Sequence, residues 1–291
     1  MHTLFVINPF SGGRDKTDIE KQITTFVGNS RTEIAFYYTT GKNDAKNIKN
    51  IIDSDSPERI IAVGGDGTVN LVARLVLNTT MVMGIIPMGS ANGLARELNL
   101  PTGITDALEV LQLNKIKKID AIRLNNQHLS VHLCDIGFNA RVIERFEKDN
   151  IRGMLGYAKH YLNEIGQYHS FKVSVQPQGK KRRKYKASML VLANATKYGT
   201  GVQINPKGKI DDGKLEIILI RPYTFKHLIH LAWSLITGTL HKLQYVKIFK
   251  GKKFTIINHE KQPFQIDGEL VEPERKITVE IIPQKLQILI P

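Results

Sequence analysis

Three short segments of the chain bring glycine together with hydroxyl, amide or carboxylate side chains. They lie at residues 8–13, 64–68 and 87–96, and each begins where a short apolar run ends. Glycine lets backbone N–H groups approach phosphate oxygens, and a helix that starts beside such a loop adds positive potential. Thr68 and Ser90 add hydroxyl donors next to the glycines. Together the three segments predict a phosphate-binding site.

Carboxylates accompany this pattern at two places. Asp66 lies inside the second glycine segment, and Asp267 and Glu269 flank Gly268 further along the chain. Phosphoryl transfer needs a phosphate cradle, a metal ion and an oriented hydroxyl group, and magnesium prefers hard oxygen ligands. An Asp-Gly pair is also typical of a hairpin turn. The residues alone leave both interpretations of 267–269 open.

The glycine segments need a scaffold that places them at one edge, and the first 120 residues predict one. Apolar strands separated by helices favour a parallel sheet that is covered on both faces. Ligands of such sheets lie at the carboxyl ends of the strands. The predicted strands are 4–7, 33–38, 59–63 and 83–87, and the predicted helices are 15–27, 44–52 and 69–77.

After about residue 120 the pattern changes to short strands with few helices, which favours an antiparallel second domain. A hairpin with an Asn-rich turn is predicted over 121–134, and a last strand at 286–290 could return to the first domain. The other predicted strands are 171–175, 187–192, 214–220, 246–249, 254–257 and 277–282, and the predicted helices are 157–168 and 224–236.

The composition narrows the class of protein. The chain has 291 residues, with 41 Lys and Arg against 27 Asp and Glu, which gives a formal net charge of +14. One cysteine, Cys134, excludes an internal disulfide framework. The N-terminus lacks the layout of a secretory signal, and no apolar run reaches the roughly 18 residues that cross a bilayer.

The standard nucleotide fingerprints are not in the sequence, which disfavours a P-loop ATPase and a Rossmann dehydrogenase. The motifs present are Asn-Pro-x-Ser-Gly at 8–12, Gly-Gly-Asp-Gly-Thr at 64–68, Gly-Ser-x-Asn-x-Leu-Ala-Arg at 89–96 and Asp-Gly-Glu at 267–269. In this order they resemble the diacylglycerol kinase catalytic family, which includes sphingosine kinases and bacterial lipid kinases.

The resemblance covers nearly the whole chain and implies a fold. It implies a phosphofructokinase-like α/β domain with a parallel sheet, followed by a C-terminal antiparallel β-sandwich, with the active site in the cleft between them. We expect an ATP-binding domain at 1–122, a lipid-substrate domain at 123–282 and a C-terminal strand at 283–291. The implied reaction transfers the γ-phosphoryl group of ATP to a hydroxyl of a lipid such as diacylglycerol or a sphingoid base.

The resemblance also implies roles for single residues. Asp66 would act through Mg²⁺, Asp267 would accept the proton of the acceptor hydroxyl as general base, and Glu269 would orient that hydroxyl or assist the metal. A hairpin turn is the alternative to a structural metal site at 211–213. The nucleotide would be held by Asn8, Ser11, Gly12, Thr39, Gly64, Gly65, Gly67, Thr68, Gly89, Ser90 and Asn92. The expected metal residues are Asp66, Asp120, Asp211 and Asp212.

One position departs from the pattern of the family. Gly93 stands where many bacterial diacylglycerol kinases carry an Asp that helps to organise the metal, and the third segment is closer to sphingosine-kinase-like members. The acceptor lipid therefore stays open. The alternatives to a lipid kinase are an NAD kinase-like enzyme, which shares the Gly-Gly-Asp-Gly motif, and a non-catalytic nucleotide- or lipid-binding regulator.

The positive charge predicts an anionic partner. Its densest cluster is formed by Lys180, Lys181, Arg182, Arg183, Lys184 and Lys186, which is either a solvated hairpin tip or a contact with anionic lipid. No nucleic-acid-binding motif accompanies the cluster, so we expect no nucleic acid partner. We expect a cytoplasmic protein that visits the inner face of the membrane as a peripheral enzyme, and a homodimer stays open.

Overall fold

The computed structural model describes residues 2–13, 18–28, 32–148, 159–160, 163–164, 169–199, 201–222 and 225–291. The chain divides into two compact units, one of Met1–Ile119 with Gln284–Pro291 and one of Asp120–Pro283. The boundaries expected from the sequence, 122 and 282, differ from these by one to three residues.

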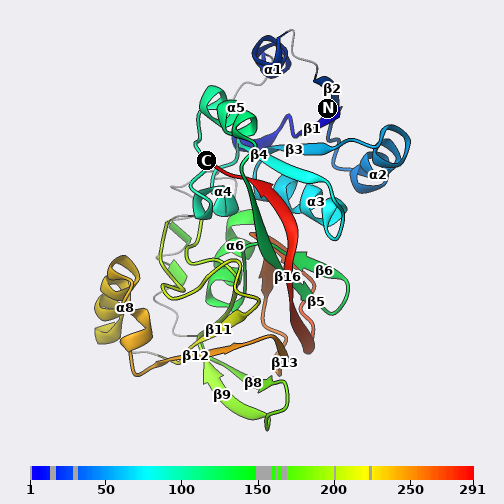
Figure 1. Cartoon of the computed structure of the whole chain (residues 1–291). Coiled ribbons are helices and arrows are strands. Elements are labelled where there is room, and N and C mark those ends of the chain that lie inside the picture. Colours follow the sequence, from blue (N-terminus) through cyan, green and yellow to red (C-terminus); the bar gives the residue numbers. More distant parts are fainter. Residues whose placement is uncertain are drawn as a thin grey trace. The chain divides into compact units, whose positions relative to one another are not determined.

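The first unit contains the predicted parallel sheet, which the structure confirms (Figure 1). Its strands lie in the order β2-β1-β3-β4, and all neighbours run parallel. The end of β16 lies parallel to β4, with Ile288 opposite Met83, so the C-terminal segment does belong to this unit. The bounds are β1 (His2–Ile7), β2 (Glu33–Tyr38), β3 (Arg59–Gly64), β4 (Val82–Pro87) and β16 (Lys276–Leu289).

Helices cover both faces of this sheet. Alternate strand residues such as Phe5 and Ile61 pack with Ile19 of α1 and Leu108 of α5, while α3 packs against β3 and β4. The structure begins α3 at Asp66 instead of at 69, because the second glycine segment leads straight into the helix. The helices are α1 (Ile19–Val27), α2 (Asp44–Asp55), α3 (Asp66–Val76), α4 (Gly93–Glu97) and α5 (Ile104–Leu113), with a 3₁₀ turn η1 at Ser11–Gly13.

The second unit contains two antiparallel sheets, as predicted. One has the order β12-β11-β10-β7-β14-β15, and the other places β16, β13, β8 and β9 side by side, with β5 and β6 paired as a hairpin. The bounds are β5 (Ile116–Leu124), β6 (His128–Ser130), β7 (Leu133–Gly137), β8 (Phe171–Pro177), β9 (Arg183–Ala187), β10 (Met189–Ala193), β11 (Leu215–Ile220), β12 (Val246–Gly251), β13 (Lys253–Asn258), β14 (Phe264–Ile266) and β15 (Glu269–Val271).

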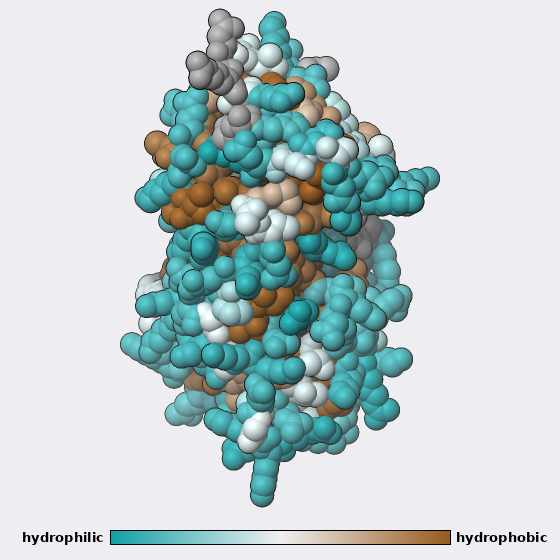
Figure 2. Space-filling model, turned by 45° about the vertical axis from the view of Figure 1, so that its right-hand side comes forward, coloured by the Kyte–Doolittle hydropathy of each residue, from teal (hydrophilic) through white to brown (hydrophobic). Residues whose placement is uncertain are grey.

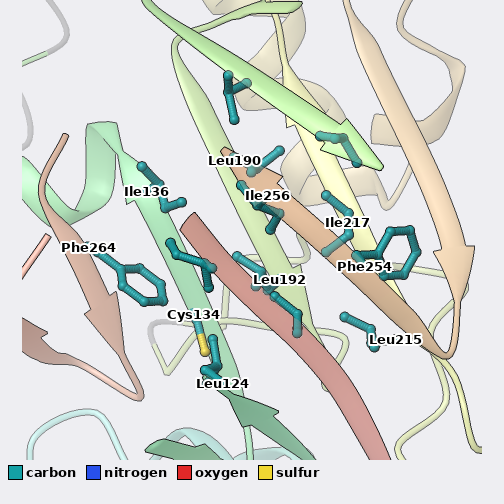
Figure 3. Close-up of a cluster of buried hydrophobic side chains, with 14 of the residues drawn as sticks. Leu124, Cys134, Ile136, Leu190, Leu192, Leu215, Ile217, Phe254, Ile256 and Phe264 are labelled. Carbon is teal, nitrogen blue, oxygen red and sulfur yellow. The ribbon is translucent and has the colours of Figure 1, made fainter. Parts of the chain in front are cut away.

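Side chains from the two sheets meet in one apolar core, which makes the unit a sandwich (Figure 3). Phe254 and Ile256 of β13 lie there with Leu190 of β10 and Cys134 of β7, and burial raises the pKa of the Cys134 thiol. The outer face of the six-stranded sheet is covered by α6 (Phe138–Lys148), α8 (Phe225–Thr237) and the 3₁₀ turn η2 (Leu240–Lys242).

Some predicted elements of this unit were wrong in their limits. The strand predicted within 127–134 is two strands, because β6 pairs with β5 whereas β7 pairs with β10 and β14. The predicted helix 157–168 lies largely outside the described residues. Within the described part of the chain, no helix has the length and apolar character to span a membrane.

Candidate active site

The three glycine segments meet at the carboxyl edge of the parallel sheet of the first unit. A Cβ on Gly12 would collide with the backbone carbonyl of Met88, and a Cβ on Gly65 would lie 3.2 Å from the Cα of Gly89. Gly12 also has a φ of 68°, in the left-handed region that glycine adopts without strain. The segments therefore touch backbone to backbone, and only glycine permits this approach.

The first segment is closed by its own side chains. The Asn8 Oδ1 accepts the N–H of Phe10 at 2.9 Å, and the Ser11 hydroxyl donates to the Asn8 carbonyl at 3.2 Å. The Asn8 N–H donates to the carbonyl of Val63, which ties the segment to the end of β3. These contacts shape a turn that lies directly beside the second segment.

The second segment fixes the carboxylate of Asp66. Asp66 is the first residue of α3, and its Oδ1 accepts the N–H of Gly93 at 2.6 Å. The bond uses the backbone N–H of residue 93, which every residue except proline has. Gly93, the departure from the family pattern, therefore still links the second segment to the third. Thr68 is buried and its side chain lies against Gly64, so its hydroxyl packs the loop from within.

The third segment is held by a reciprocal pair of hydrogen bonds. Asn92 accepts the N–H of Gly89 through Oδ1 and donates through Nδ2 to the Gly89 carbonyl, both at 2.8 Å. Asn92 itself has a φ of 51° and is buried. Ser90 is exposed at the tip of the segment. Asn92 is thus a residue that shapes the loop, while Ser90 faces solvent.

A fourth loop lies at this edge, and only its Thr39 was recognised from the sequence. It follows β2, where Thr39 donates its N–H to the Ile7 carbonyl, and it is organised by Asp44. The Asp44 carboxylate accepts the N–H groups of Thr40 and Gly41 at 2.9 and 2.8 Å and the Tyr37 hydroxyl at 2.8 Å. Burial alone would raise the pKa of Asp44, but these hydrogen bonds lower it below its ordinary value. An Asp at the start of the predicted helix 44–52 was the available signal.

The first unit thus brings the three glycine segments and one carboxylate, that of Asp66, together at one edge of its sheet. A Cβ at Gly12, Gly65 or Gly89 would run into the backbone of a neighbouring loop, so glycine at these positions lets the three loops pack closely. Asp66 supplies a hard carboxylate oxygen at the start of an 11-residue helix, where an anion is also favoured. Asp66 would hold the metal, which neutralises charge on the transferred phosphoryl group when bound.

The second unit holds the other predicted carboxylates in a two-residue hairpin turn. β14 and β15 pair with Ile266 opposite Glu269, and the residues between them, Asp267 and Gly268, have φ values of 49° and 94°. Two positive φ values are the requirement of a type I′ turn, for which Asp-Gly is a preferred sequence. The turn found from the sequence is therefore real, and it presents Asp267 in one fixed direction.

The Asp267 carboxylate is held by a neighbouring stretch of backbone. Its Oδ1 accepts the Ser130 hydroxyl at 2.6 Å and the N–H groups of His132 and Leu133, both at 3.1 Å. Its Oδ2 accepts the N–H of Val131 at 2.9 Å. This is a preorganised carboxylate, positioned by the junction between β6 and β7.

The fully buried carboxylate of Asp135 also supports this turn. Asp135 accepts hydrogen bonds from Asn139, from the Ala140 N–H and from Gln265, and Gln265 in turn accepts the N–H of Gly268 at 2.7 Å. Burial raises the pKa of Asp135 to about 6, against the lowering effect of its hydrogen bonds. Neither Asp135 nor Gln265 was recognised from the sequence, because neither lies in a motif.

Of the remaining predicted metal residues, Asp120 lies beside the turn that contains Asp211 and Asp212. Asp120 is buried and accepts the N–H of Gly213 at 2.6 Å. The Lys250 ammonium group lies 2.7 Å from Asp212 and 2.6 Å from the nearly buried Glu216, and these contacts raise the pKa of Lys250 against the effect of its burial. The Lys250 ammonium group already contacts both carboxylates and occupies the place of a cation beside Asp212, so the geometry does not fit a metal ion bound by Asp212.

No group of three or more His, Cys, Asp or Glu side chains suited to a metal ion occurs among the described residues. Asp66 belongs to the first unit, while Asp120, Asp211 and Asp212 belong to the second. A magnesium role for Asp66 therefore depends on the phosphates themselves supplying ligands, as is usual for this ion.

Comparison with known proteins identifies the two units. Residues 2–124 match the diacylglycerol kinase catalytic domain, and residues 133–290 match the YegS C-terminal NAD kinase beta sandwich-like domain. The chain is similar to a probable lipid kinase YegS-like protein of Yersinia enterocolitica, 25% identical over 305 residues that cover 100% of this chain and 97% of that protein. Another probable lipid kinase YegS-like protein, from Chromohalobacter salexigens, is 32% identical over 174 residues, 57% of this chain and 55% of that protein.

Solved structures share the fold. The crystal structure of a diacylglycerol kinase from Bacillus anthracis str. Sterne is similar to this chain, with a TM-score of 0.71 and 18% sequence identity. The match covers 100% of this chain and 97% of that one. A second crystal structure from the same organism has a TM-score of 0.80 at 21% identity and the same coverage.

Proposed function

Because this chain belongs to the diacylglycerol kinase family of lipid-kinase-like proteins, we propose that it transfers the γ-phosphoryl group of ATP to a hydroxyl of a lipid. One observation carries the proposal: the three glycine segments touch backbone to backbone around Asp66, whose carboxylate is fixed by the Gly93 N–H. A cradle of this kind positions phosphates, and positioning is most of what phosphoryl transfer requires.

The roles of the residues follow from their contacts. Gly12, Gly65 and Gly89 would let backbone N–H groups line the phosphate site, and Asp66 would hold magnesium. Asp267 would take the proton of the acceptor hydroxyl, which suits a carboxylate that four hydrogen bonds hold in one direction. Glu269 is exposed at the end of the same turn and would orient the acceptor.

The acceptor is tested with the full chain, labelled ATP and magnesium. We expect phosphate to appear in diacylglycerol or a sphingoid base presented in detergent, and none in NAD. Transfer to NAD with none to either lipid would overturn the proposal in favour of an NAD kinase. ATP binding without transfer to any acceptor would favour a non-catalytic regulator.

The site is tested with Asp66→Asn, in which the amide oxygen can still accept the Gly93 N–H while the negative charge is lost. Transfer should fall roughly 100-fold or more, because the charge that holds the metal is worth several kcal/mol in the transition state. Asp53→Asn, an exposed carboxylate on α2, is the matched control and should keep full activity. Wild-type turnover in a folded Asp66→Asn protein would place the active site elsewhere.

A further inference from the structure

The excess of positive over negative charge in this protein lies in one third of its sequence. Residues 165–259 contain 18 Lys and Arg but three Asp and Glu, whereas the other 196 residues contain 23 and 24. Two of the three acidic residues, Asp212 and Glu216, are already paired with Lys250. The second unit therefore carries +12 of the net charge of +14, and the first unit carries +2.

The structure shows where part of this charge lies. β8 and β9 run antiparallel, with Lys172 opposite Lys186 and Ser174 opposite Lys184. Because side chains alternate along a strand, Phe171 and Val173 point into the core while these three lysines point outward, where all are exposed. We call Lys172, Lys184 and Lys186 the lysine face.

Like charges gather on this face at a cost to folding. A cross-strand pair of like charges is destabilising, and the pair Lys172–Lys186 is one. Beside it, the pKa of His259 is lowered by burial and by the charges of Lys184, Arg275 and Arg182, while Glu260 opposes this. The Glu260 carboxylate lies beside Lys172, but the cations of this face outnumber it, and the excess positive charge suits an anion outside the chain.

We propose that the lysine face docks on the anionic surface of a lipid bilayer. The proposal rests on the proposed function, since a kinase whose acceptor is a lipid must reach a bilayer. A paired strand surface presents its cations side by side, which suits a planar array of lipid phosphates, and each lysine near such a surface adds to binding. In Figure 2 the end of this unit that carries β8 and β9 is covered by hydrophilic residues.

The test compares two triple variants of the full chain that lose the same charge. The first is Lys172→Gln, Lys184→Gln and Lys186→Gln on the lysine face. The second is Lys21→Gln, Lys46→Gln and Lys49→Gln, at exposed positions of α1 and α2 in the first unit. Binding is measured by co-sedimentation with vesicles of phosphatidylcholine alone or mixed with phosphatidylglycerol, at about 0.05 M and about 0.5 M salt.

Wild-type protein should bind the mixed vesicles at low salt and release them at high salt. The lysine-face variant should bind them roughly 100-fold more weakly at low salt, while the control variant binds like wild type. Equal binding by the two variants would overturn the proposal. Tighter binding of the wild type to duplex DNA than to the mixed vesicles, at the same salt, would also overturn it and indicate a nucleic acid partner.

Stability and kinase activity are measured on the same variants, so that lost vesicle binding can be distinguished from unfolding and from lost catalysis. Removing the Lys172–Lys186 repulsion should leave the lysine-face variant at least as stable to urea as wild type, so lost binding cannot be attributed to unfolding. Transfer to a lipid dispersed in detergent should be unchanged in both variants. If wild-type protein phosphorylates no lipid in detergent, the proposed function fails, whereas the vesicle result is independent of that outcome.

Discussion

Replacing Asp135 with Asn should change how the stability of the second unit depends on pH. Burial raises the pKa of this carboxyl group to about 6, from an ordinary value of 3.8. The folded unit therefore favours the protonated form, whose stabilising effect is complete below pH 3.8 and is lost as the pH rises through about 6. About two pKa units correspond to about 3 kcal/mol of unfolding free energy.

The Asp135→Asn variant cannot titrate at this position. The difference in unfolding free energy between variant and wild type should therefore move by about 3 kcal/mol in favour of the variant between about pH 3 and about pH 8. At the acid end the variant should be the less stable protein, because its amide places N–H donors against the donors of Asn139 and Gln265. Urea unfolding followed by circular dichroism at a series of pH values measures both effects.

Asp53→Asn is the control for the loss of one negative charge. Comparing each variant with wild type at every pH cancels the titration of all groups that variant and wild type share. A stability difference that stays constant over this pH range would refute the assignment of a raised pKa to Asp135. Because Gln265 also accepts the Gly268 N–H, the variant should further speed hydrogen exchange at Gly268. Unchanged exchange there would show that Asp135 does not support the Asp267 turn.

The contacts give expected outcomes for four further variants. Gly12→Ala should abolish ATP binding in calorimetry, since the added Cβ collides with the neighbouring backbone, and normal affinity would contradict the packed-loop site. Asp267→Asn should lower kcat by about 10²–10⁴-fold with little change in ATP affinity. Ser130→Ala, which removes one of its donors, should lower kcat less, and equal losses would indicate only a damaged turn. Lys250→Met should lower the free energy of unfolding in urea by about 2 kcal/mol, because Glu216 is left buried without its cation. If magnesium raised the melting temperature of the wild-type protein, this would contradict the role of the ammonium group as the cation at this place.

The parallel sheet could be predicted because its signals are local. Each strand is an apolar run that stops at a glycine or proline segment, and β2 was predicted with the bounds that the structure gives. β9 was not predicted as a strand, because the charged Arg183 lies on the same side as Tyr185 and Ala187, which leaves only two inward-facing residues to mark the alternation of a half-buried strand. β14 and β15, at three residues each, are too short to show a period.

The candidate site likewise has a part that could be predicted from the sequence and a part that could not. The glycine segments and the Asp267 turn are local patterns, and in the structure they form loops and a turn that hydrogen bonds close. What holds Asp267 is distant in sequence, since Ser130 lies 137 residues away, and Asp135 lies 130 residues from Gln265. Pairing between β7 and β14 brings these residues together, and a single sequence contains no signal for that register.

The support of Asp267 bears on how its role is to be tested. In Asp267→Asn an NH₂ group would face the backbone donors that the carboxylate accepts, so the variant loses both a base and the bonds that fix the turn. The size of its kcat loss alone therefore cannot distinguish a general base from a structural residue. Ser130→Ala weakens the support of Asp267 but keeps the carboxylate. If Asp267 is the general base, the pH–rate profile of Ser130→Ala should keep the shape of the wild-type profile, whereas the profile of Asp267→Asn should lose its acidic limb.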